Sequence, residues 1–352
     1  MKINYRLVRS PAPAWFSAII PLLAIVVTFL ITSVFIIIAG ANPFEAYYYF
    51  LISPLTSKIG ILEVLVKSTP LILTGAAVTI AFASGYWNIG AEGQLYAGAV
   101  AAAWLGTTLI GVPQPAAILI MLLGGFIAGM LWALIPAILK VKLSVDEVVT
   151  TLLMNYVALF FVSALLNGPW RDPVSNWPQS PDILASTMMP KLFPPSRLHF
   201  GFIVGVLAVV TIWFILSRTG LGMRMRSVGM GQEAARFMGV KIGRTMFITA
   251  LISGGIAGLA GVTEVAGIHF HLIDAISPGY GYTGIIAATL GNLNPFGSMA
   301  ASLFLGLIST GSQAVSRSLG VPTFLGDVVQ ATLLLVTLAM FLLRNYTLRK
   351  VE

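Results

Sequence analysis

Long apolar runs separated by short polar segments make up most of the chain. Ten of these runs approach the length of about 20 residues that a helix needs to cross a bilayer. They are residues 15–40, 62–83, 88–110, 116–139, 147–167, 200–217, 246–268, 279–292, 297–315 and 323–343. The run 279–292 is too short to cross in the usual way, so we expect a broken or re-entrant helix there. The pattern predicts an all-α, polytopic membrane protein with about ten transmembrane helices, one of them short or broken.

The composition supports this class. Of the 352 residues, 57% are hydrophobic and 9% are charged, and the mean hydropathy is +0.93. A soluble domain is about 25% charged, so this chain has too few charges to coat a soluble globule. The net charge of +8 could indicate nucleic-acid binding, but the basic residues lie between the apolar runs rather than in one patch. The lack of cysteine excludes disulfides and thiolate-bound metals. We expect one membrane domain, residues 1–352, with its spans within 15–343.

Lysine and arginine are distributed unevenly between the two sides of the predicted bundle. With ten spans and a cytosolic N-terminus, 14 of them fall on the inside and 5 on the outside. The 14 are Lys2, Arg6, Arg9, Lys140, Lys142, Arg218, Arg224, Arg226, Arg236, Lys241, Arg244, Arg344, Arg349 and Lys350, and the 5 are Lys58, Arg171, Lys191, Arg197 and Arg317. Because cytosolic loops carry the excess of positive charge, both termini and the segment 218–245 are predicted to be cytosolic. The Pro-rich segment 168–199 is predicted to be an extracytoplasmic loop, with Trp170 and Trp177 as interface anchors.

The first apolar run also resembles a secretory signal, since basic residues precede it and Ala39-Gly40-Ala41 ends it. A signal core has roughly 7–15 apolar residues, and this run is much longer. We therefore expect a retained first span.

A polar stretch, GYWNIGAEGQLYAGA at 85–99, interrupts the apolar pattern. On a helix, Asn88, Glu92 and Tyr96 would share one face, because they lie four residues apart. A carboxylate near hydrocarbon is costly, so Glu92 should face protein or water. Two interpretations remain open. The face lines a pathway, or Glu92 accepts hydrogen bonds from free amides at a helix N-terminus.

Two further charged residues lie within predicted spans. Glu264 either lines a path opposite Glu92 or extends toward the outer interface, and the same alternatives hold for Lys67. The aromatic residues Tyr86, Trp87, Tyr280 and Tyr282 could stack on a ring-bearing solute or anchor the chain at the interface.

Short repeated patterns carry information about packing. GYWNIG (85–90) and GYGYTG (279–284) begin on opposite sides of the predicted bundle, as the halves of an inverted repeat would. Two G-x-x-x-G pairs, 125/129 and 254/258, predict close helix packing.

His269, His271 and Asp274 are more consistent with a solvated loop than with a metal site. No phosphate-binding G-x-x-x-x-G-K-[ST] motif occurs, so the chain has no P-loop ATP site of its own.

The cytosolic stretch GQEAARFMG predicts a short helix. Glu233 lies early and Arg236 late, which favours the helix dipole, and Ala234 and Ala235 are strong helix formers. Phe237 and Met238 would form an exposed apolar tip. We interpret this element as a docking site for another protein.

This stretch is similar to the coupling-helix motif of permease subunits from ATP-binding-cassette (ABC) importers of the ribose, simple-sugar, branched-chain amino-acid and nucleoside branch. The matching residues are Gly229, Glu233, Ala234, Ala235, Arg236, Phe237 and Gly239. WNIGAEGQLYAGA (87–99) and the stretches 146–173 and 279–306 resemble nucleoside-type permeases that depend on a basic-membrane-protein lipoprotein. The sugar branch usually has Asp-Leu-Ser-Val-Gly where this chain has Asn-Ile-Gly-Ala-Glu-Gly, which favours a nucleoside.

The resemblance implies a multi-pass permease in the inner or plasma membrane of a prokaryote, importing a nucleoside or simple sugar. It implies no cofactor and no enzymatic activity of its own, because ATP binds a partner ATPase. The other implied partners are a second permease subunit, of the same or a paralogous chain, and an extracytoplasmic solute-binding protein or lipoprotein. The candidate pathway residues are Asn88, Glu92, Tyr96, Glu264 and Tyr282. An ion-coupled secondary transporter, with Glu92 and Glu264 carrying protons, is the alternative.

Overall fold

The computed structural model describes residues 5–9 and 14–350 of the chain, so Lys2 lies outside the described residues. The chain divides into two compact units, Ser57–Leu307 and a smaller one formed by Met1–Thr56 with Ile308–Glu352. The boundary falls within one helix, α12 (Pro295–Leu319).

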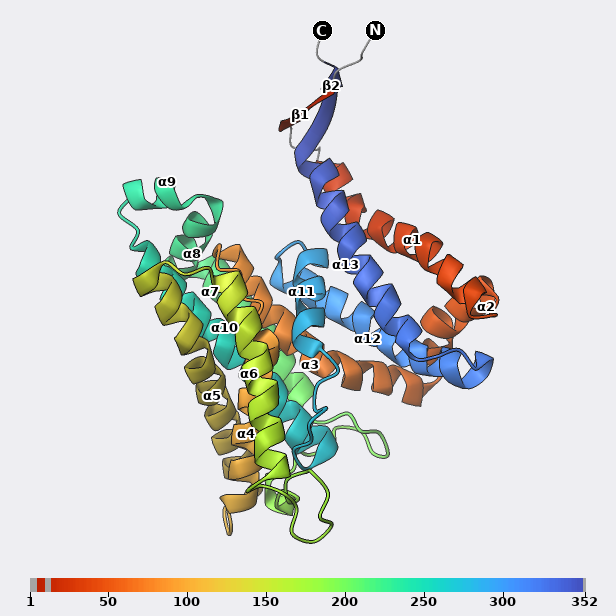
Figure 1. Cartoon of the computed structure of the whole chain (residues 1–352), viewed down its shortest axis with the longest axis vertical. Coiled ribbons are helices and arrows are strands. Elements are labelled where there is room, and N and C mark those ends of the chain that lie inside the picture. The colour runs from red at the N-terminus through yellow and green to blue at the C-terminus, as the bar shows by residue number, and fades with distance from the viewer. Residues whose placement is uncertain (1–4, 10–13, 351–352) are drawn as a thin grey trace. The chain divides into compact units, whose positions relative to one another are not determined.

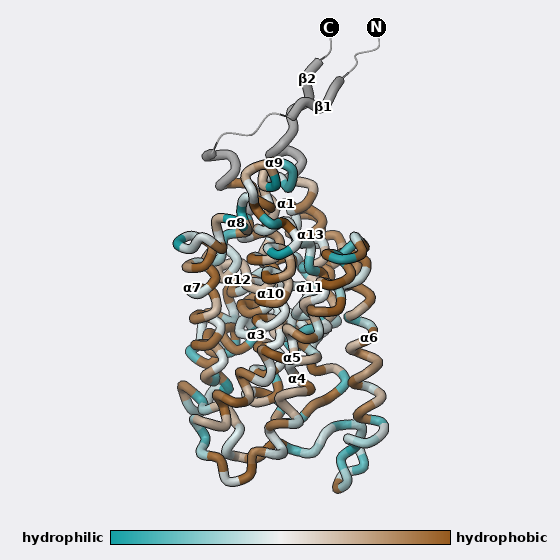
Figure 2. The backbone as a smooth tube through the Cα atoms, turned by 90° about the vertical axis from the view of Figure 1, so that its left-hand side faces the viewer, coloured by the Kyte–Doolittle hydropathy of each residue, from teal (hydrophilic) through white to brown (hydrophobic). Residues whose placement is uncertain are grey.

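The larger unit is helical. Its elements are α3 (Lys58–Ala83), α4 (Ala91–Thr108), α5 (Gln114–Leu143), α6 (Glu147–Asn167), a 3₁₀ turn (Ala185–Thr187), α7 (Gly201–Arg218), α8 (Gly220–Met230), α9 (Gln232–Phe237), α10 (Ile242–Glu264) with a π-helical end (Val265–His269), α11 (Tyr280–Leu290) and the start of α12. The centre of this unit is formed by α3 and α10. In their apolar 18-residue stretches, 89% and 72% of the residues are buried, compared with 28% for α5, 22% for α6 and 33% for α7. Figure 2 shows mostly hydrophobic residues along these outer helices, and many of these residues are exposed, so their outward faces are suited to lipid.

The two G-x-x-x-G pairs pack against each other, which confirms the predicted close approach. A β-carbon at Gly129 of α5 would collide with the Gly254 carbonyl oxygen of α10. A β-carbon at Gly258 would likewise collide with the Gly125 carbonyl oxygen. Only glycine lets the two backbones approach this closely.

The two ends of this unit differ in the segments they carry. Figure 1 shows α8 and α9 at one end and the loop 168–199 at the opposite end. The loop is held by backbone hydrogen bonds to the end of α10 and the segment after it, such as Met189 N–H to Ala266 O (2.8 Å) and Ser180 N–H to Leu272 O (2.9 Å). Within this unit, α8 and α9, which are predicted to be cytosolic, thus lie at the end opposite the predicted extracytoplasmic loop 168–199.

The smaller unit combines the first and last helices. It holds β1 (Tyr5–Arg9), α1 (Ala14–Ile38), α2 (Pro43–Tyr47), a π-helix (Tyr48–Ile52), a 3₁₀ turn (Ser53–Leu55), the end of α12, α13 (Phe324–Asn345) and β2 (Tyr346–Lys350). The helical stretches Leu22–Ile38 and Pro43–Leu55 meet at a bend of 120°. The Tyr47 hydroxyl closes this bend by donating to the Phe29 carbonyl oxygen of α1. β1 and β2 pair antiparallel, with Tyr5 opposite Lys350, so the fold departs from the predicted all-α class by this short ribbon.

The predicted apolar runs are helical, and the polytopic membrane class is confirmed. A helix occupies each of the ten runs. Within the described residues, six helices are long and apolar enough to cross a membrane, or seven if the bent pair forms one span. The helix in the run 279–292, α11, has only 11 residues, as its short apolar run predicted. The count of ten crossings and the cytosolic side of the termini stay predictions.

Candidate functional site

The segment before α4 is a break in the helical chain that buried amides hold together. Asn88 has no exposed surface. Its Nδ2 donates to Gln94 Oε1 and to Ser253 Oγ (both 2.9 Å), and its Oδ1 accepts from Gly90 N–H (2.9 Å) and Gln94 Nε2 (3.1 Å). Asn88 therefore precedes α4 instead of sharing a helical face with Glu92 and Tyr96, and the predicted three-residue stripe does not form. The physical reason is that its side chain replaces the missing helical hydrogen bonds of the break.

Glu92 lies where two helix N-termini meet. It is in the first turn of α4 and is 6% exposed. Its Oε2 accepts a hydrogen bond from Gly281 N–H (2.6 Å) in the first turn of α11, and the Ser277 hydroxyl and Gly279 N–H also interact with the carboxylate. A carboxylate is favoured there because the first amides of a helix have no intrahelical acceptor. This geometry confirms the helix-terminus interpretation, whereas a pathway role stays a prediction.

Two residues of α6 that the sequence analysis did not select brace the same junction. Asn155 Oδ1 accepts from Gly93 N–H (2.8 Å), and its Nδ2 donates to the Ile89 carbonyl oxygen (2.9 Å) and the Tyr282 hydroxyl (3.1 Å). The Thr151 hydroxyl accepts from Ile89 N–H (3.1 Å). One buried amide thus links α6 to α4 and α11. The only available signal was a polar residue in the middle of an apolar run.

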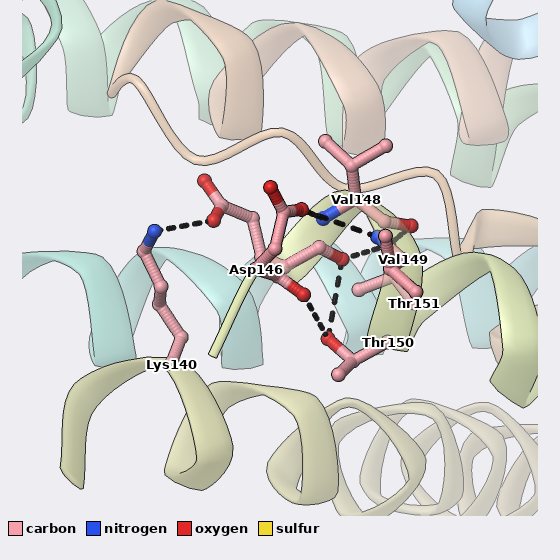
Figure 3. A network of polar contacts seen from close by, with 7 residues as sticks. Lys140, Asp146, Val148, Val149, Thr150 and Thr151 are labelled. Carbon is pink, nitrogen blue, oxygen red and sulfur yellow. Dashed lines mark hydrogen bonds and ion pairs between the residues drawn. The ribbon is translucent and has the colours of Figure 1, made fainter. Parts of the chain in front are cut away.

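The turn between α5 and α6 holds the start of α6, which carries Thr151 (Figure 3). Asp146 caps α6 by accepting from Val148 N–H (2.8 Å), and Lys140 of α5 pairs with the buried Glu147 (2.5 Å). The Thr151 hydroxyl donates to the Glu147 carbonyl oxygen (2.6 Å) while it accepts from the break before α4. The turn therefore stabilises both α6 and the break.

The predicted aromatic residues take several roles. Tyr96 is buried on α4, and its hydroxyl donates to the Asp274 carbonyl oxygen (2.9 Å). Tyr86 and Tyr280 are also buried in the protein, so they are not interface anchors. Trp87 is half-exposed with its ring against Phe82 (4.6 Å between centroids). Tyr282 is partly exposed and joins the junction around Glu92 through its bond to Asn155.

Glu264 lines a separate polar cavity of about 220 Å³ together with Lys67, Arg197, His269 and Tyr280. It is 4% exposed, and both interpretations of its direction, toward a path or toward the outer interface, stay predictions. Its carboxylate is 3.7 Å from His269 Nε2 and forms no hydrogen bond with any described residue. The cavity thus places a buried acid among cationic groups.

The histidines near this cavity do not gather around one metal. His269 faces Glu264, whereas His271 Nδ1 lies 3.1 Å from Asp182 Oδ1. Across the described ranges, no group of three or more His, Cys, Asp or Glu side chains could hold a metal ion.

The predicted short helix is α9, and its tip is exposed as predicted. Phe237 is 96% and Met238 66% exposed, whereas Ala235 is fully buried. Glu233 and Arg236 are exposed on the same six-residue helix. Gly239 ends it with a φ of +78°, a conformation that favours glycine.

Gly229 lies outside α9, where α8 touches the end of α3. A β-carbon at Gly229 would collide with the Ala83 carbonyl oxygen, and Gly85 lies against the same glycine. Ala83 is the last residue of α3, and the break before α4 follows it directly. The exposed helix α9 therefore follows α8 directly, and α8 contacts the break that leads to Glu92.

The two broken helices are arranged as an inverted repeat would predict. GYWNIG leads from α3 into α4, and GYGYTG begins α11 after α10. α4 packs on α10 while α11 packs on α3, so each broken helix lies against the long helix of the other half. Their N-termini meet at Glu92, since a β-carbon at Gly281 would collide with the Glu92 backbone.

Comparisons with known proteins give one consistent result. Residues 60–338 match the family described as branched-chain amino acid transport system / permease component. The chain is similar to a glucose ABC transporter permease protein of Haloferax volcanii, with 34% identity over 96% of this chain and 91% of that protein. It is also similar to a guanosine ABC transporter permease protein of Bacillus subtilis (32% identity; 93% and 94% covered) and a nucleoside ABC transporter permease protein of Lactococcus lactis (28% identity; 92% of each).

Proposed function

The chain belongs to the family of permease components of branched-chain amino acid transport systems, and from this membership we propose that it is the membrane-spanning subunit of an ATP-driven importer for a nucleoside or a simple sugar. The relatives named for glucose, guanosine and nucleosides support these two solute classes. The proposed topology has ten membrane segments, with both termini and α9 in the cytosol and the loop 168–199 outside.

The exposed tip of α9 is the observation that carries this proposal. Phe237 is 96% exposed at the end of a short helix whose polar residues Gln232, Glu233 and Arg236 are also exposed. An apolar side chain held fully in water at the tip of an ordered helix is suited to a partner surface. The proposed partner is an ATPase subunit that binds ATP and grips α9. A second permease subunit and an extracytoplasmic solute-binding protein complete the proposed transporter.

The contacts suggest how motion at α9 would reach the solute path. A displacement of α9 would move α8, whose Gly229 lies against the end of α3 at Ala83. The break after α3 leads to Glu92, which is bonded to Gly281 at the start of α11. Movement of α8 would therefore shift the two broken helices relative to each other. We propose Glu92, Tyr96 and Tyr282 as residues near this moving junction, with Asn88 and Asn155 as its braces.

The experiment is uptake of radiolabelled guanosine and glucose by proteoliposomes that contain the purified transporter. Ala234→Trp and Glu233→Lys should abolish uptake and co-purification of the ATPase, because both residues are exposed on α9 and their replacement need not disturb the fold. Matched controls are Ala116→Trp and Glu45→Lys, which are exposed outside α9. Normal ATPase binding and uptake in the α9 variants would refute docking at this helix. Uptake that stops when ion gradients collapse, with ATP present, would favour the ion-coupled alternative.

A further inference from the structure

The polar cavity beside α10 contains an acid and a base that share one space without pairing. Glu264 of α10 and Lys67 of α3 both line it. Within the described residues, Lys67 and Glu264 form no ion pair with each other, because the Lys67 nitrogen is more than 4.0 Å from the carboxylate oxygens of Glu264. Arg197, at the rim, is already paired with Glu63. Within the described residues, the cavity therefore holds an ammonium group without an ion pair opposite a carboxylate whose one ionic contact is His269 Nε2 at 3.7 Å.

Of these two charged groups, the Glu264 carboxylate is the one that most requires a hydrogen-bond partner. The Glu264 side chain is 5% exposed, and its nearest charged partner, His269 Nε2 at 3.7 Å, is beyond hydrogen-bonding distance. A buried carboxylate without a hydrogen bond costs several kcal/mol relative to one in water, so such groups are normally bonded. A ligand that donates hydrogen bonds inside the cavity would meet this requirement.

We propose that this cavity binds a vicinal diol of the transported solute, with Glu264 accepting from one hydroxyl group and Lys67 donating to the diol oxygens. A hydroxyl group is both a donor and an acceptor, so two adjacent hydroxyls can bridge a carboxylate and an ammonium group that do not reach each other. The buried ring of Tyr280 forms part of the wall and offers an apolar face to the sugar ring. This inference rests on the proposed function, because ribose and hexoses share this diol.

The position of the cavity fits a site for solute arriving from outside. Arg197 belongs to the end of the loop 168–199, and His269 ends the helical stretch that begins with α10. The loop 168–199 lies at the end of the unit opposite α9 (Figure 1). The bound diol would thus lie on the proposed extracytoplasmic side of the junction formed by Glu92 and Gly281.

The test compares two labelled solutes, guanosine and 2′-deoxyguanosine, in uptake by proteoliposomes that contain the whole transporter. Glu264→Gln keeps the size of the side chain but removes its charge. It should lower guanosine uptake at limiting concentration by about 10- to 100-fold, the usual effect of losing a hydrogen bond to a charged group. The loss for 2′-deoxyguanosine should be at least several-fold smaller. Lys67→Gln should give the same pattern, and Lys58→Gln, on the exposed start of α3, should leave both rates unchanged.

The ratio of the loss of guanosine uptake to the loss of 2′-deoxyguanosine uptake reports the effect of the cavity alone, because the solute-binding protein is the same in every sample. Equal losses for both solutes in folded Glu264→Gln protein would overturn the inference, as would unchanged guanosine uptake. Thermal unfolding midpoints identify a variant that fails to fold, and Lys67→Gln then provides the deciding comparison. If the wild type imports glucose and not guanosine, glucose and 2-deoxyglucose replace the pair. Failure of the wild type to import any of these solutes would instead count against the proposed function.

Discussion

Replacement of Glu92 by alanine tests the junction between α4 and α11. The carboxylate accepts from Gly281 N–H at 2.6 Å and also interacts with the Ser277 hydroxyl and Gly279 N–H. A hydrogen bond to a charged group contributes about 1.5–3 kcal/mol, and an unpaired buried amide costs about 1–3 kcal/mol. Removing the buried charge offsets part of this loss, because the carboxylate no longer has to be desolvated. We expect Glu92→Ala to lower the free energy of unfolding by about 3 kcal/mol.

Glu92→Gln separates the hydrogen bond from the charge. Glutamine retains an oxygen that can accept from Gly281 N–H, but it lacks the negative charge that favours the helix N-terminus. It should therefore lose about half as much stability as alanine, roughly 1–2 kcal/mol. Glu45→Ala, at an exposed position of α2, is the control and should change stability by less than about 0.5 kcal/mol.

The assay is thermal unfolding of the purified protein in detergent, followed by uptake measured per amount of folded protein. If about 1 kcal/mol shifts the midpoint by about 2 °C in a chain of this size, Glu92→Ala should lower it by roughly 6 °C. A midpoint within about 1 °C of the wild type would refute the hydrogen-bonding role. Uptake that falls in proportion to stability would mark a purely structural acid, whereas a larger loss of uptake would support the pathway role.

Three further predictions follow from other contacts. Gly229→Ala should reduce uptake by at least about 10-fold while the ATPase still co-purifies, because its β-carbon meets the Ala83 carbonyl oxygen, and Gly220→Ala on the same helix, with open space around it, should have no effect. Burial lowers the pKa of the loop residue His199 from 6.5 to about 4, so only the unfolded chain takes up a proton between these values. The free energy of unfolding should then be constant above pH 6.5 and fall by up to about 3 kcal/mol toward pH 4, and His199→Phe should abolish this dependence in pH-resolved unfolding. Asn155→Leu should lower the unfolding midpoint and abolish uptake, because it leaves the Gly93 amide of α4 and the Ile89 carbonyl oxygen of the break unpaired, and a wild-type midpoint would contradict this.

Local features of the fold could be predicted from the sequence. Apolar runs identified the helical segments, the short run gave the short helix α11, and GQEAARFMG gave α9 with Phe237 exposed. Glycine spacing gave the contact between α5 and α10. In each case the signal is contained in a few neighbouring residues, so hydrophobic period and propensity suffice.

Contacts between distant segments could not be predicted in this way. The bond between Glu92 and Gly281 joins residues 189 positions apart, and nothing in either stretch specifies the other. Asn155 looked like an isolated polar residue of an apolar helix, because its three partners belong to α4, the break before it and α11. The pairing of β1 with β2 depends in the same way on bringing both ends of the chain together. Such contacts are properties of the tertiary arrangement and have no local sequence pattern.

The most direct test of the central claim is ATP-dependent uptake by proteoliposomes in which the ion gradients have been collapsed. The complete transporter, with the ATPase and the solute-binding protein, should import labelled guanosine or glucose under these conditions. The same vesicles should import neither solute when Ala234→Trp blocks α9 or when the ATPase is omitted. Uptake by this chain without any ATPase, or undiminished uptake in the α9 variant, would contradict the claim that a partner drives this permease through α9.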